Sequence, residues 1–103
     1  MTAGKSILPT LYPVNIGHFL KFKTENSTQV KYLHKHIKCL SEMGKTKELP
    51  TAYGYLSVGY LKLGMLEQAE SAASTQAEMA VECKDERCIL QANTNLGKAF
   101  LLA

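Results

Sequence analysis

The chain has 103 residues, with twelve Lys and Arg against nine Asp and Glu, a net charge of +3 and 46% apolar residues. This length allows one domain, and the apolar share is typical of a globular protein. No apolar run reaches the roughly 18 residues of a membrane span, and Pro9 and Pro13 interrupt the region where a signal peptide is apolar. Composition therefore disfavours a membrane protein, a disulfide scaffold and a basic nucleic-acid tail, and we expect a cytoplasmic protein.

The first 27 residues lack a sustained helical pattern. Pro9 and Pro13 interrupt any early helix, because proline has no amide hydrogen to donate to the preceding turn. The sequence predicts an N-terminal arm or a degenerate helix for residues 1–27. Asn26, with Gln29 three positions later, is typical of a helix cap, so a helix is expected to begin there.

From residue 28 onward, apolar residues recur at helical steps of three and four in four successive segments. They are Val30, Leu33, Ile37 and Leu40; Tyr53, Leu56, Tyr60 and Leu63; Ala69, Ala72, Ala73, Ala77 and Ala80; and Ile89, Ala92, Leu96 and Phe100. Gly44 and Gly64 are stop signals, Pro50 suits a first helical turn, and Asp85 is a good cap for the last segment. No strand pattern occurs between them. We therefore predict an all-α fold in which short connections make neighbouring helices antiparallel.

A shift of about forty positions aligns the chain with itself. The pairs include Ala52 with Ala92, Leu56 with Leu96, Gly59 with Ala99 and Tyr60 with Phe100. Ala52-Tyr53, Leu56, Gly59-Tyr60 and Gly64, followed by Glu67, Ala69 and Ala77, resemble a tetratricopeptide repeat (TPR) of the longer subclass found in Pins-type scaffolds and rapsyn. The resemblance covers residues 28–103. It implies one complete helix pair and two partial pairs, stacked as a short TPR-like α-solenoid.

The resemblance implies a non-catalytic scaffold that needs no cofactor and binds a partner peptide or helix on a concave surface. Helical geometry turns one stripe of residues away from the core in the second segment, and the same stripe recurs one repeat later. The expected partner-binding residues are Tyr55, Val58, Lys62, Asn95 and Lys98. The complete pair is expected to span residues 46–82 and to cross at Gly59 and Ala69/Ala77, where small side chains permit close approach.

Two other functions compete with protein binding. The first competing function is that of a small helix-turn-helix nucleic-acid-binding domain. It is favoured by the positive charge of residues 1–49, which contain eight lysines and only three acidic residues. It is also favoured by a basic stripe at helical spacing, formed by Lys31, His34, Lys35 and Lys38. The small overall charge speaks against it. An enzyme is disfavoured, because the chain has no phosphate loop, nucleophile elbow or paired carboxylates.

The cysteines do not indicate a disulfide or a metal site. Cys39, Cys83 and Cys88 are odd in number, so we expect reduced thiols that folding does not require. His34 and His36 point about 200° apart on a helix, which prevents them from sharing a zinc ion.

The last segment is expected to lack part of its packing. Phe100, Leu101 and Leu102 should form an exposed apolar patch, because a first TPR helix buries only one face without its second helix. The sequence therefore predicts self-association through residues 86–103, and it reads as a fragment or short isoform of a longer repeat protein.

Overall fold

A computed structural model describes residues 3–103 of the chain, with side chains from Leu20 onward. The described residues form four α-helices and one short 3-10 helix, and they contain no strand. In chain order these are α1 (Ala3–Glu42), η1 (Thr46–Glu48), α2 (Leu49–Lys62), α3 (Leu66–Cys83) and α4 (Glu86–Leu102). The predicted all-α fold class is confirmed.

The helix ends lie where the sequence places them from Gly44 onward. Gly44 and Gly64 follow α1 and α2 with φ of 72° and 75°, a conformation that glycine adopts at little cost. Pro50 lies in the first turn of α2, where no amide hydrogen is needed. Asp85 caps α4, because its carboxylate accepts a hydrogen bond from the Cys88 backbone N–H at 3.2 Å.

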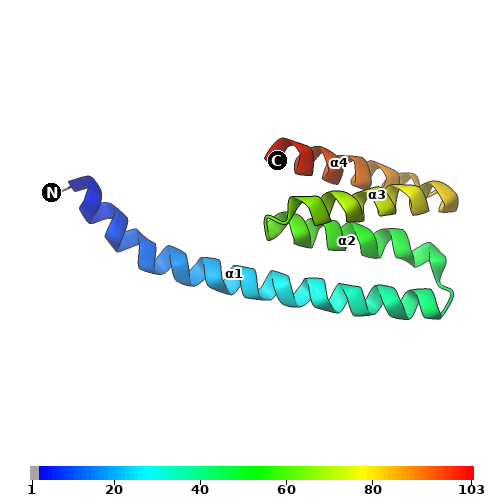
Figure 1. Cartoon of the computed structure of the whole chain (residues 1–103), viewed down its shortest axis with the longest axis horizontal. Coiled ribbons are helices and arrows are strands. Elements are labelled where there is room, and N and C mark those ends of the chain that lie inside the picture. Colours follow the sequence, from blue (N-terminus) through cyan, green and yellow to red (C-terminus); the bar gives the residue numbers. More distant parts are fainter. Residues whose placement is uncertain (1–2) are drawn as a thin grey trace.

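The helix start predicted at Asn26 is wrong, and so is the interruption of an early helix at Pro9 and Pro13. α1 runs without a break from Ala3 through both prolines to Glu42, although it bends toward its N-terminus (Figure 1). Of the predicted arm, only residues 1 and 2 lie outside the described residues. Asn26 is buried within α1, and its side-chain amide donates to the Phe22 carbonyl at 2.8 Å. An amide that bonds one turn back along its own helix does not cap the next turn.

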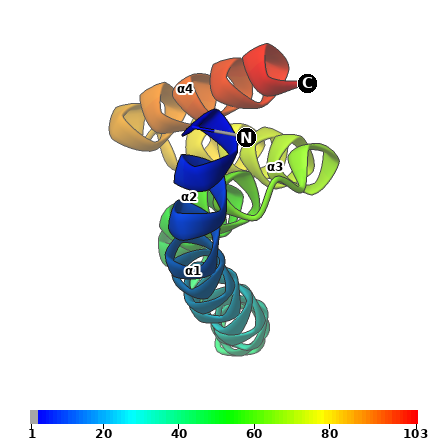
Figure 2. The same ribbon diagram turned by 90° about the vertical axis from the view of Figure 1, so that its left-hand side faces the viewer.

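The four helices lie side by side, with α1 along one edge and α4 along the other (Figure 1). α1 packs against α2, α2 packs against both α3 and α4, and α3 packs against α4. The N-terminal part of α1 extends well beyond the other helices, and Figure 2 looks along it toward the rest of the chain. The molecule therefore measures 61 × 26 × 19 Å.

The hydrophobic core lies between α1 and α2 and reaches into α3. Its buried members are Val30, Ile37, Leu40, Leu49, Ala52, Leu56 and Ala72, with Leu33, Tyr53, Tyr60, Leu63 and Met79 packed against them. The apolar stripes predicted before and after Gly44 therefore face one another. Burying such side chains is the main favourable contribution to folding.

The crossing of α2 and α3 includes the predicted Ala69 but differs from the prediction at Gly59 and Ala77. Ser57 makes the close approach, because its hydroxyl donates to the Ala69 carbonyl at 2.8 Å and both residues are fully buried. Gly59 faces α1 instead: a Cβ built there would lie 2.9 Å from Cγ2 of Val30 and near no atom of α3. Ala77 is only half-buried, whereas Ala73 is fully buried.

The described helices do not meet the requirement for a membrane span. None of them is both long enough and apolar enough to cross a lipid bilayer.

Candidate functional site

Helices α2 and α4 lie parallel and in contact, with α3 antiparallel to α2. Thr51 Oγ1 lies 3.6 Å from Cys88 Sγ, and a Cβ at Gly54 would lie 2.7 Å from Oε1 of Gln91. Both contacts advance in the same direction along the two helices, which makes the helices parallel. Ser57 meets Ala69 and Gly54 meets Gln76, so α3 runs the opposite way.

A hydrogen bond between two amide side chains, the buried Gln76 and the exposed Gln91, joins α3 to α4 beside Gly54. Gln76 is fully buried, and its Nε2 donates to Oε1 of Gln91 at 3.0 Å. Oε1 of Gln76 and Nδ2 of Asn95 are buried without a hydrogen-bond partner. An unpaired buried polar group costs roughly 1–3 kcal/mol, so α3 holds one acceptor and α4 holds one donor whose pairing would stabilise the chain.

The structure brings most of the predicted partner-binding residues to the surface. Tyr55 is 58% exposed, Lys62 and Lys98 are exposed, and Val58 is half-buried. Asn95 is the exception, because it is only 2% exposed and its amide lies inside the fold. Its prediction as a surface contact is therefore wrong, since the packing of α4 on its neighbours covers it.

A groove between the C-terminal part of α1 and the start of α2 includes Tyr55. Its volume is about 270 Å³, and it is lined by His36, Lys47, Glu48, Thr51, Ala52 and Tyr55. His36 also stacks on Tyr32, with ring centroids 6.0 Å apart and planes 6° apart. Sequence reasoning did not assign His36 or Lys47 to a binding surface, and it did not find the groove. The spacing of Tyr32 and His36, four residues apart on a helix, was the available signal for an aromatic pair.

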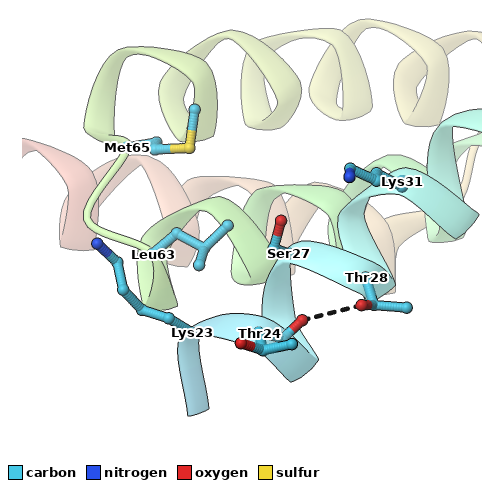
Figure 3. Close-up of a pocket in the computed structure, with 7 residues that line it drawn as sticks. All are labelled: Lys23, Thr24, Ser27, Thr28, Lys31, Leu63 and Met65. Carbon is cyan, nitrogen blue, oxygen red and sulfur yellow. Dashed lines mark hydrogen bonds between the residues drawn. The ribbon is translucent and has the colours of Figure 1, made fainter. Parts of the chain in front are cut away.

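A second hollow, of about 490 Å³, lies at the opposite end of α2 (Figure 3). It is lined by Lys23, Thr24, Ser27, Thr28, Lys31, Leu63 and Met65. Its threonine hydroxyls are already used within α1: Thr24 donates to the Leu20 carbonyl and Thr28 to the Thr24 carbonyl, each at 2.9 Å. Exposed lysine and hydroxyl side chains on one helix do not build a specific site.

The predicted basic stripe is exposed, but one of its members bonds to another helix. Lys31, Lys35 and Lys38 are exposed along α1. His34 Nε2 lies 2.6 Å from the Tyr60 hydroxyl, and the two rings meet edge to face. His34 therefore helps to hold α1 against α2.

The thiols and other candidate metal ligands are dispersed. Cys39, Cys83 and Cys88 are free thiols, of which Cys88 is buried. Within residues 20–103, no three His, Cys, Asp or Glu side chains gather where they could hold a metal ion.

No protein-family model, curated protein or solved structure matches this chain. The resemblance to tetratricopeptide repeats therefore stays a prediction from the residues.

Proposed function

We propose that the chain is a non-catalytic interaction module that binds a protein segment on the side of the molecule shared by α2 and α4. In this proposal α2 and α3 form one TPR-like pair, and α1 and α4 belong to the pairs before and after it. The observation that carries the proposal is the parallel contact of α2 with α4, at Thr51 with Cys88 and at Gly54 with Gln91. Stacked helix pairs place their first helices next to each other in this way, and such stacks present extended binding surfaces.

The side chains on this surface favour an acidic segment with apolar residues. Tyr55 offers an exposed aromatic ring, and Lys62 follows it two turns later on the same stripe of α2. Lys98 follows Gln91 by the same interval on α4. The groove beside Tyr55 adds the Lys47 ammonium group and the His36 ring, together with one acid, Glu48. Aromatic side chains are enriched among the residues that contribute most to protein interfaces, and charges complementary to those of a partner favour its approach.

Fluorescence anisotropy with short labelled peptides tests this function. A peptide rich in Asp and Leu should bind, and peptides of equal length rich in Lys and Leu or in Ser and Leu should not. Tyr55→Ala should weaken binding about tenfold, because a central aromatic contact contributes more than 1 kcal/mol. Lys62→Glu combined with Lys98→Glu should abolish it.

The matched control is Lys35→Glu combined with Lys38→Glu, which changes the charge equally on the exposed face of α1. Binding that survives the α1 reversal and fails in the α2/α4 reversal supports the proposal. The opposite result, together with tight binding to duplex DNA that falls steeply with salt, would instead support nucleic-acid binding.

A further inference from the structure

The open face of α4 corresponds, position by position, to the face of α2 that holds α3. On α2, the Ser57 hydroxyl donates to the Ala69 carbonyl, and Gly54 borders Gln76. These two α2 residues belong to a stripe at helical spacing whose members are buried or half-buried: Pro50, Tyr53, Gly54, Ser57 and Leu61. The forty-residue shift of the sequence carries this stripe onto a single stripe of α4: Leu90, Asn93, Thr94, Gly97 and Leu101.

α4 lies at one edge of the row of helices (Figure 1), and its stripe is exposed over its whole length. Leu90 is 67% exposed and Leu101 is 84% exposed. A Cβ built at Gly97 would meet no atom within 4 Å, whereas Ser57, at the corresponding position of α2, is fully covered. Residues 88–97 carry no charge. Apolar residues exposed together on an uncharged face are typical of an interaction surface.

We propose that this α4 stripe binds a helix of a partner protein, which lies antiparallel to α4 and contacts it through alanines. The packing of α3 on α2 supplies the register. Ser57 lies opposite Ala69, and the fully buried Ala73 follows one turn later on α3. The first alanine of the partner therefore lies opposite Gly97, which is smaller than Ser57 and allows the same close approach of two helices. The stripe is separate from the Tyr55 surface, so its role does not rest on the proposed function.

One difference between the two stripes defines the partner further. Gln76 of α3 fits against α2 because Gly54 has no side chain: a Cβ there would lie 2.5 Å from Nε2 of Gln76. On α4 the corresponding position is Thr94, whose side chain occupies that space. The partner helix therefore carries a small residue, and not glutamine, at the position equivalent to Gln76.

Two synthetic peptides test the proposal, each labelled with a fluorophore and titrated with the full chain. One has the sequence of residues 66–82, and the other has the same sequence with Gln76→Ala. Both carry the alanine stripe of α3, but only the second lacks the glutamine that would meet Thr94. Fluorescence anisotropy should show that the Gln76→Ala peptide binds about tenfold more tightly than the unchanged peptide, because overpacking weakens the contact of the latter.

Substitutions at Gly97 distinguish the α4 stripe from other binding surfaces. Gly97→Ser introduces the residue that α2 has at the corresponding position, so it should retain binding of the Gln76→Ala peptide. Gly97→Leu should abolish binding, because a leucine side chain prevents the close approach. Neither substitution should unfold the chain, since a Cβ at this position meets no atom within 4 Å. Circular dichroism checks this.

The matched control is Lys62→Glu. The peptides contain four acidic residues and no basic one, so they could also bind the Tyr55 surface, to which Lys62 belongs. Binding at the α4 stripe should be unchanged by Lys62→Glu. Thr94→Gly tests the register: it should remove most of the difference in affinity between the two peptides, because it restores the space that Gly54 provides on α2.

Three results with the peptides would overturn the proposal. They are the failure of both peptides to bind, binding of the Gln76→Ala peptide that Gly97→Leu leaves unchanged, and binding that Lys62→Glu abolishes. A second copy of the chain as the occupant is a fourth outcome that overturns it. Sedimentation equilibrium without peptide would then show a dimer, which Gly97→Leu would dissociate.

Discussion

Gly54 makes room for the hydrogen-bonded Gln76 and Gln91 side chains where α2, α3 and α4 meet. A Cβ at this position would lie 2.5 Å from Nε2 of Gln76 and 2.7 Å from Oε1 of Gln91. Its sequence context gave no sign of this role, because the two glutamines come from α3 and α4 and meet only after the helices pack. The residue scale is therefore where sequence reasoning was weakest, as the buried Asn95 also shows.

Gly54→Ala should destabilise the chain by about 1–3 kcal/mol, because the added methyl group separates Gln76 from Gln91. Urea denaturation followed by circular dichroism measures this. Gly97→Ala, at a concentration where the chain is monomeric, is the matched control and should stabilise it by up to ~1 kcal/mol. Equal effects of the two substitutions would contradict the packing described at Gly54.

The cap of α4 gives the stability a dependence on pH. Hydrogen bonds from the Cys88 side chain and then from its backbone N–H hold the pKa of Asp85 below its ordinary value. A carboxyl whose pKa is lower in the folded chain stabilises folding above its unfolded pKa of about 3.9, and this contribution is lost as the pH falls through the folded pKa. Urea midpoints should therefore decrease on acidification below about pH 4. The Asp85→Asn variant keeps a capping oxygen that does not titrate. Its urea midpoint should therefore decrease less than that of the original chain over the same pH interval.

At the scale of elements, periodicity predicted α2, α3, α4 and the C-terminal half of α1, and the stop signals fixed their ends. Gly44, Gly64 and Asp85 act through local backbone geometry, which a sequence carries directly. The same reasoning did not predict the N-terminal half of α1. Pro9 and Pro13 were interpreted as helix breakers, and the helix-forming residues around them were given less weight. Asn26 was misassigned because an asparagine side chain can either cap a helix through its oxygen or donate from its nitrogen to a carbonyl of its own helix, and here it donates.

The contact between α2 and α3 depends on alanines that are covered completely. Ala73→Leu should destabilise the chain by about 1–3 kcal/mol, because its site is fully buried and cannot expand without moving α2. Ala77→Leu should lower the free energy of unfolding by a smaller amount, since Ala77 is half-buried. Thermal unfolding of the two variants compares them. A larger decrease in the unfolding midpoint for Ala77→Leu than for Ala73→Leu would support the crossing at Ala77 that the sequence predicted.

At the scale of the whole molecule, the part of α1 that follows Lys23 packs together with α2, α3 and α4. Leu20 and Phe22 are 57% and 43% exposed, and the first buried side chain in the part of α1 from Leu20 onward is Asn26. The α1 stripe that begins with Val30 faces the core. The contact of α2 with α4 and the packing of α3 against both depend on contacts between residues far apart in the sequence. The forty-residue period indicated this arrangement only through the resemblance to tetratricopeptide repeats.

Removal of residues 1–20 should leave the unfolding midpoint of the remaining helices unchanged, because, among the side chains described from Leu20 onward, the first member of the hydrophobic core is Val30. Removal of residues 1–31 should lower it clearly, since Val30 then leaves the core and its contact with Gly59 is lost. Differential scanning calorimetry distinguishes these outcomes. Similar losses in both truncations would show that the projecting part of α1 packs against the other helices.

The projecting part of α1 also governs how the molecule moves through a solvent or a porous matrix. The radius of gyration is 17.5 Å, whereas a spherical chain of 103 residues would have one of about 13 Å. By the same scaling, 17.5 Å belongs to a spherical protein of roughly 230 residues. A single copy should therefore elute from a gel-filtration column close to where a spherical dimer elutes. Elution volume therefore cannot distinguish a monomer from a dimer. Light scattering or sedimentation is needed, because these methods measure the molecular mass.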